Sequence, residues 1–100
     1  MSTLHLLSHS PFGDDRFDSC LRLVGNQDAI LLSGEAVQAL RASTHPRQCL
    51  EQLPEGIALF ALEEDVAARA IGSQPSRIKL LDYPGFVTLC VQYDKVNSWL

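Results

Sequence analysis

The chain has 100 residues, of which 46% are hydrophobic and 20% are charged, and its formal net charge is −4. This composition supports one packed domain, leaves little room for a second and excludes a disordered chain. The eight basic residues are scattered along the sequence, whereas nucleic-acid binding normally needs a concentrated basic face. Direct binding to nucleic acid or to an anionic membrane is therefore not expected.

The ends of the chain and its cysteines indicate the compartment. The N-terminal residues lack the basic segment followed by an apolar segment that marks a secretory signal. The apolar runs span only a handful of residues, which is too short to cross a bilayer. The three cysteines (Cys20, Cys49 and Cys90) are widely spaced and odd in number, unlike a secreted disulfide framework. We expect a cytoplasmic protein.

The first half of the chain alternates between apolar runs and amphipathic segments. Residues 3–7 form the first predicted strand, and a helix is predicted over about 14–24, with acidic residues at its start, where the exposed N–H groups favour negative charge. The second predicted strand, 29–33, is apolar up to its last residue and is expected to be covered on both faces. A turn at Ser33-Gly34 leads into a predicted helix that ends at about residue 42.

The second half continues the same alternation. The His45-Pro46 pair is expected to break the preceding helix, and 47–53 is predicted as a short helical turn. A third apolar strand is predicted over 57–62, followed by a helix over 63–72 whose first turn is acidic.

A fourth strand is predicted over 78–81, with Asp82 as the cap of a last helix over about 85–92. The remaining residues are expected to form a tail. This pattern predicts a small three-layer α/β/α domain with a mainly parallel sheet of about four to five strands.

The sequence lacks a complete set of catalytic residues. It contains neither of the glycine-rich phosphate motifs, and Gly34 after the second strand is explained by a turn. His5 and His9 are four residues apart, but no third ligand is close to them in sequence, so no metal site is predicted. The acidic run from Glu63 to Asp65 fits the first turn of a helix, where negative charge is favourable.

Cys20 is the one residue with a chemical interpretation of its own. It lies at the edge of the apolar stripe of the first helix, and Arg16 is four residues earlier, on the same helical face. A neighbouring cation favours the thiolate, so Cys20 is a candidate sulfur carrier and Arg16 a candidate thiolate-stabilising residue. Leu23 extends the apolar stripe past Cys20, so a purely structural role in the core is the alternative.

An ordered set of short segments over nearly the whole chain resembles the TusB/DsrH family. The segments are Leu4-His5, Ser10-Pro11-Phe12, Phe17, Cys20-Leu21-Arg22-Leu23, Asp28-Ala29-Ile30-Leu31-Leu32, Ala61-Leu62-Glu63-Glu64-Asp65, Ala68-Arg69, Leu81-Asp82-Tyr83, Phe86-Val87, Leu89 and Trp99. No single motif among them is diagnostic, but their order and the chain length agree with the family.

The resemblance implies a domain of the DsrE/DsrF/DsrH type, in which three related subunits form a heterohexamer with two copies of each. Such complexes pass persulfide sulfur from cysteine to cysteine. In the TusB setting the sulfur reaches the 2-position of the wobble uridine of certain tRNAs. The main sulfur-carrying cysteine belongs to a TusD/DsrE-like sister subunit, and a TusC/DsrF-like subunit is the other partner. This chain would then be a non-catalytic accessory subunit without a cofactor.

Several alternatives stay open on the sequence alone. The DsrH setting serves dissimilatory sulfur oxidation instead, and gene neighbours would separate it from tRNA thiolation. Cys20 matches a cysteine position of DsrH-like members, so an active persulfide carrier is a second hypothesis. A stand-alone small-molecule domain of flavodoxin-like shape ranks last, because the phosphate loop is missing. Trp99 is a candidate interface residue, or else it folds back onto its own domain.

Overall fold

Five strands form one sheet in the order β4-β3-β2-β1-β5 in the computed structural model, which describes residues 2–72 and 74–99. Their bounds are β1 Thr3–Leu7, β2 Ala29–Leu32, β3 Ala58–Leu62, β4 Ile78–Leu81 and β5 Lys95–Trp99. All four neighbouring pairs are parallel. The predicted α/β class and parallel sheet are confirmed, with five strands in the described part of the chain.

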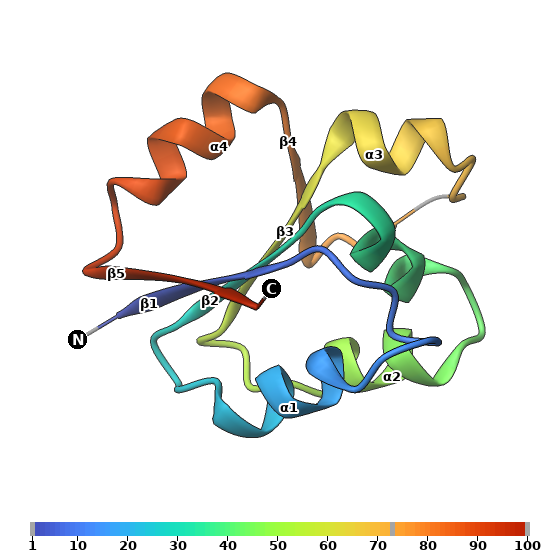
Figure 1. Ribbon diagram of the computed structural model, residues 1–100, viewed down its shortest axis with the longest axis horizontal. Helices are drawn as coiled ribbons and strands as arrows, with labels where there is room; N and C mark the ends of the chain where they lie inside the picture. Colours follow the sequence, from blue (N-terminus) through green and yellow to red (C-terminus); the bar gives the residue numbers. More distant parts are fainter. Residues whose placement is uncertain (1, 73, 100) are drawn as a thin grey trace.

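Helices cover both faces of this sheet (Figure 1). They are α1 Arg16–Leu23, the 3₁₀ helix η1 Gly34–Leu40, α2 His45–Glu51, α3 Glu63–Ala68 and α4 Tyr83–Cys90. The helices α1 and α2 lie side by side on one face, and α4 crosses the other face. None of the helices in the described part is both long and apolar enough to cross a bilayer.

The sheet separates two apolar layers of unequal size. The larger layer, on the α1/α2 side, includes Phe17, Cys20, Val37 and Leu50, each at most 2% exposed. The smaller layer lies between the sheet and α4, which contributes only one residue that is more than nine-tenths buried, Leu89. Because one short helix covers this face, much of α4 is left at the surface.

Besides the helix predicted over 63–72, which ends at Ala68, three sequence predictions need correction. The segment after Gly34 is a 3₁₀ helix that ends at Leu40, and not a longer α-helix. The His45-Pro46 pair begins α2 instead of breaking a helix, because Thr44 caps the first turn by accepting a hydrogen bond from the Arg47 backbone N–H. Proline is well tolerated at this position, since its missing N–H would have no partner within the helix.

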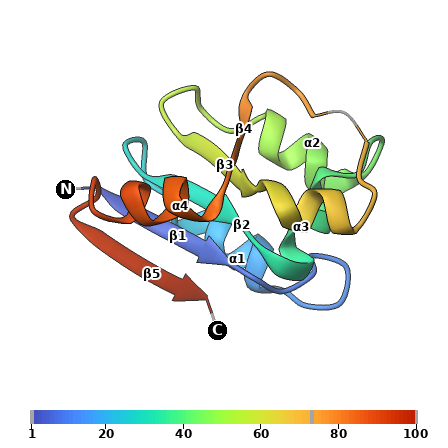
Figure 2. The same cartoon turned by 90° about the horizontal axis from the view of Figure 1, so that it is seen from above.

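The third correction concerns the C-terminal segment, which is a strand and not a tail. Strand β5 pairs with β1 in parallel register, from Thr3 opposite Lys95 to Leu7 opposite Trp99. It forms one edge of the sheet, and the chain reaches it by way of α4, which passes from β4 at the opposite edge (Figure 2). Its first four residues are exposed, so the strand lacks the apolar run that identified the others.

Two local predictions are confirmed. The Asp82 side chain accepts a hydrogen bond from the Gly85 backbone N–H at 2.8 Å, which makes it the cap of α4. Gly34 adopts a positive φ of 51°, a conformation that favours glycine, and its N–H donates to Oδ2 of Asp65 at 2.9 Å. The turn after β2 therefore explains Gly34 without a bound phosphate.

Candidate functional site

Three hydrogen-bonded side chains connect β5, β1 and the loop before β2. Nε1 of Trp99 lies 3.1 Å from Nδ1 of His5, and Nε2 of His5 lies 3.2 Å from Oδ2 of Asp28. His5 is in the middle of β1 and is 5% exposed. Trp99 lies two positions beyond the residue opposite His5 in the strand register, so both side chains are on the α1 side of the sheet.

The indole fixes the protonation pattern of this array. An indole N–H can only donate, so Nδ1 of His5 accepts the bond from Trp99. The ring proton is then on Nε2, which donates to the Asp28 carboxylate. The array therefore has one direction, from indole to imidazole to carboxylate.

Asp28 is the acceptor on which the array ends. Oδ1 accepts the Thr3 backbone N–H at 2.9 Å, and Oδ2 accepts the Gly25 backbone N–H at 2.8 Å. Burial raises the pKa of Asp28, but the bonds from Gly25, Thr3 and His5 outweigh it and hold that pKa below its ordinary value of 3.8. The carboxylate thus ties the start of β1 to the end of the α1–β2 loop.

The structure places Cys20 inside the core, where it is 0% exposed. Burial, and then the negative charge of Asp28, raise the pKa of its thiol to about 12. Arg16, the candidate stabilising cation, binds the carboxylate of Asp14. A thiol in this environment is protonated at neutral pH, so reaction at its sulfur would require α1 to move. The geometry favours the packing interpretation, and sulfur carriage by Cys20 stays a prediction.

Trp99 is used within its own domain. It packs against the larger apolar layer, and its ring centroid lies 6.1 Å from that of His5. This is the alternative in which the tryptophan folds back, and an additional contact with a partner stays a prediction. Nothing in the sequence connected His5 or Asp28 with Trp99, because Trp99 lies at the other end of the chain.

A hollow of about 420 Å³ lies where β1, β2 and β3 end, beside α4. The carboxyl ends of the strands in a parallel sheet are where α/β domains commonly bind ligands. The charged residues that line it are Glu64 and Asp65, so an anionic phosphate would meet negative charge there. Within residues 2–72 and 74–99, no group of three histidine, cysteine or acidic side chains could hold a metal ion. Because its charged lining is acidic, the hollow gives no support to the flavodoxin-like alternative, in which it would bind a phosphate group.

The outer side of α4 carries an exposed apolar ridge, formed by Tyr83, Val87 and Val91. These residues are 58%, 58% and 79% exposed, and their spacing of four places them on one helical face. The opposite side of α4, with Leu89 and Phe86, packs on the sheet. A helix that is apolar on all sides is normally buried on all sides, so this ridge is a candidate subunit interface. The spacing was visible in the sequence, but the exposure was not.

The profile of the family described as "DsrH like protein" matches residues 9–96. A protein from Salmonella paratyphi B named "Protein TusB" is 36% identical over 97 residues, which is 96% of this chain and 99% of that protein. The chain belongs to the TusB/DsrH family. Proteins with the same name from Enterobacter sp. and Salmonella dublin are 34% and 35% identical over the same share of both chains.

The fold of this TusB/DsrH-family member also agrees with a solved structure. It matches the crystal structure of the ychN protein from E. coli with a TM-score of 0.79, over 98% of this chain and 99% of that one. The two sequences are only 17% identical, so this likeness supports the fold alone. Together the comparisons confirm the family and the α/β architecture that the sequence predicted.

Proposed function

We propose that this chain is an accessory subunit of a cytoplasmic sulfur-relay complex, which passes persulfide sulfur toward 2-thiolation of the wobble uridine of tRNA. Its partners would be TusC/DsrF-like and TusD/DsrE-like subunits in a heterohexamer. The observation that carries the proposal is the 36% identity to proteins named TusB over 96% of the chain. A sister subunit would hold the principal cysteine, and this chain would take part without a cofactor or a catalytic role of its own.

The exposed ridge of α4 supports assembly with sister subunits. Three apolar side chains on one helical face lose contact with water when a partner covers them, which is the main favourable term in association. The sheet also has free edges at β4 and β5, and a partner can shield such edges from unwanted strand pairing. The net charge of −4 fits a subunit that leaves tRNA contact to another chain.

Co-expression with the two sister subunits tests the proposal. All three chains should elute as one complex in size-exclusion chromatography. Val87→Asp should weaken association by about tenfold or more, because a charge would be buried in the apolar contact. Leu23→Asp is the matched control, since Leu23 is 69% exposed on the opposite face. If this chain stays monomeric with its partners, the subunit role is refuted, and if both variants assemble normally, the α4 ridge is not the interface.

The biological role needs a separate measurement. In a bacterium without its own TusB subunit, this chain should restore 2-thiouridine at the wobble position, measured by mass spectrometry of digested tRNA. The match to the DsrH profile favours one alternative, a subunit serving dissimilatory sulfur oxidation. Assembly with the partners but no recovery of thiolated tRNA would favour that alternative.

A further inference from the structure

The three cysteines have different surroundings in the folded chain. Cys20 is fully buried, and Cys90 is partly buried against the apolar layer beneath α4. Cys49 is partly exposed on α2, and its Sγ lies 3.5 Å from Nε2 of His45. Of the three, Cys49 combines access to solvent with a neighbouring base.

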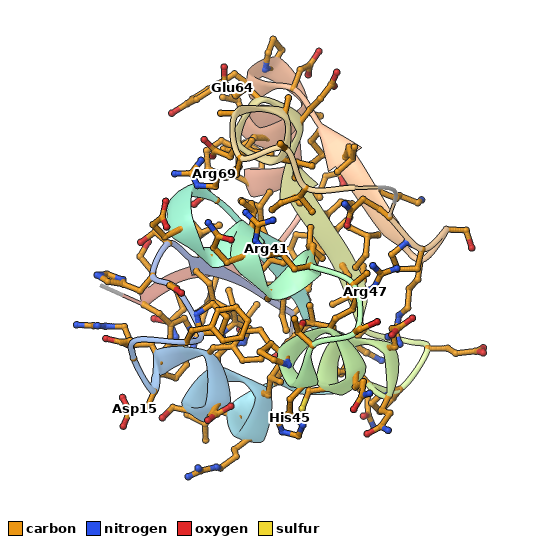
Figure 3. The ribbon with its side chains drawn as sticks, turned by 90° about the vertical axis from the view of Figure 1, so that its right-hand side faces the viewer. Asp15, Arg41, His45, Arg47, Glu64 and Arg69 are labelled. Carbon is orange, nitrogen blue, oxygen red and sulfur yellow. The ribbon has the colours of Figure 1, made fainter. Side chains whose placement is uncertain are left out.

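Helix geometry brings the two side chains together. His45 is the first residue of α2 and Cys49 lies four residues later, so both are on one face of the helix. The Thr44 cap and Pro46 fix the first turn, which carries the imidazole. His45 is exposed and lies on the outer side of α2, facing away from the sheet (Figure 3). Cys49 packs its inner side against the larger apolar layer, which leaves its sulfur beside the ring.

We propose that Cys49, with His45 as its proton acceptor, is a sulfane-sulfur acceptor in this chain. The inference rests on the proposed function, because it assigns a step within the sulfur relay to a residue of the accessory subunit. A nucleophile and a base within hydrogen-bond reach form the arrangement that activates thiols in proteins. The donor is a persulfide of the form R–S–SH, carried by a small thiol or by a sister subunit.

The transfer balances without an oxidant or a reductant. Nε2 of His45 takes the thiol proton, and the Cys49 thiolate attacks the outer sulfur of the donor. One S–S bond forms between Cys49 and that sulfur while the S–S bond of the donor breaks. The leaving thiolate takes the proton back from the imidazolium. The products are a Cys49 persulfide and the thiol R–SH, and the same exchange in reverse passes the sulfur on.

Sulfur loading of the full chain tests the acceptor. The protein is treated with glutathione persulfide, and its peptides are analysed by mass spectrometry under non-reducing conditions. The added sulfur should be on Cys49 and should disappear in Cys49→Ser, while Cys90→Ser and Cys20→Ala keep it. Sulfur that persists in Cys49→Ser, or an unmodified Cys49 in the folded wild type, overturns the proposal.

The role of His45 needs a readout that a structural contact would not change. Alkylation of Cys49 by iodoacetamide should be about tenfold slower in His45→Ala, the order expected from losing one charge-assisted hydrogen bond to the thiolate. Added imidazole should restore the rate in His45→Ala but not change it in the wild type. His9→Ala is the control, since His9 is exposed in the loop after β1 and its ring lies beside Ser8. An unchanged rate in His45→Ala, or no rescue by imidazole, refutes the assignment.

These results are separable from the proposed function. Loading and alkylation use the isolated chain, whereas assembly and tRNA thiolation use the complex. A chain that assembles and supports thiolation but leaves Cys49 unmodified contradicts only the acceptor role. A chain that loads sulfur on Cys49 and never assembles contradicts the subunit role.

Discussion

Replacing Asp28 by asparagine tests the polar array that connects β5, β1 and the loop before β2. Oδ1 of Asp28 accepts a hydrogen bond from the Thr3 N–H, while Oδ2 accepts hydrogen bonds from the Gly25 N–H and from Nε2 of His5. The asparagine side chain has a single acceptor oxygen, so its NH₂ group must face one of these donors. The shape of the side chain is unchanged, which confines the perturbation to hydrogen bonding and charge.

The expected loss of stability follows from those contacts. A hydrogen bond to a charged group contributes about 1.5–3 kcal/mol, and an unpaired buried donor costs a similar amount. The side chain of Asp28 is 12% exposed, so solvent screening is slight. The asparagine variant loses one of the three hydrogen bonds, and the remaining two lose the negative charge of their acceptor. Together these changes should lower the free energy of unfolding by about 2–4 kcal/mol, which is a large part of the stability of a domain this size.

The pH dependence has a definite sign. The pKa of Asp28 is lower in the folded protein than its ordinary value of 3.8, so the folded state binds fewer protons at this site than the unfolded state. The stabilisation is therefore complete well above 3.8 and is lost as the pH falls through the lower folded value. The difference between wild type and Asp28→Asn should shrink accordingly in acid.

Urea unfolding followed by circular dichroism measures both effects. The midpoints of wild type and variant are compared at about pH 7 and at successively lower pH toward about 3. Asp15→Asn is the matched control, because Asp15 is exposed and its side chain makes no capping bond at the start of α1. A difference that is equal at both ends of the pH range would refute the argument, as would an equal effect of the control.

The remaining predictions concern stability and use thermal or urea unfolding. Trp99→Phe should lose about 1–2 kcal/mol, because Nδ1 of His5 loses its donor; an unchanged midpoint would mean that the bond does not form in solution. Gly56→Ala should destabilise by about 1–3 kcal/mol, since its Cβ would lie 2.7 Å from a backbone carbonyl oxygen, whereas Gly13→Ala meets nothing within 4 Å and should be tolerated. Cys20→Ser should be about 1–2 kcal/mol less stable than Cys20→Ala, because it buries a hydroxyl; the reverse order would argue against a core position.

Most of the sheet was predictable because its central strands consist of apolar runs. The bounds of β1 and β4 agree with the prediction, and the predicted second and third strands each contain one extra residue. Burial on both faces requires continuous apolar sequence, and the residues that follow these strands are turn or cap residues. The fifth strand was not predicted, because it lies at an edge of the sheet, where Lys95, Asn97 and Ser98 can face water.

The candidate site was less predictable, because its contacts join residues that are far apart in the chain. Trp99 and His5 are separated by 94 positions, and a local sequence pattern cannot predict a contact between residues so far apart. Cys20 was expected at the edge of the apolar stripe of its helix, but it is fully buried and Leu23 beyond it is exposed, because the burial of each side chain depends on the layers packed around α1. The pair of His45 and Cys49 had a visible spacing of four, but the helical turn was predicted to begin at residue 47, after a break at His45-Pro46, which left His45 outside the helix.

The pairing of the first strand with the last has a consequence for the order of folding. Strand β1 lies between β2 and β5, so one of its two edges stays unpaired until a strand some ninety positions later has been synthesised. Contacts of such high sequence separation close slowly and form late. A growing chain that has completed β4 would still expose the edge of β1, together with the imidazole of His5. That interval is when the chain is most open to pairing with a neighbour, and the arrival of Trp99 ends it.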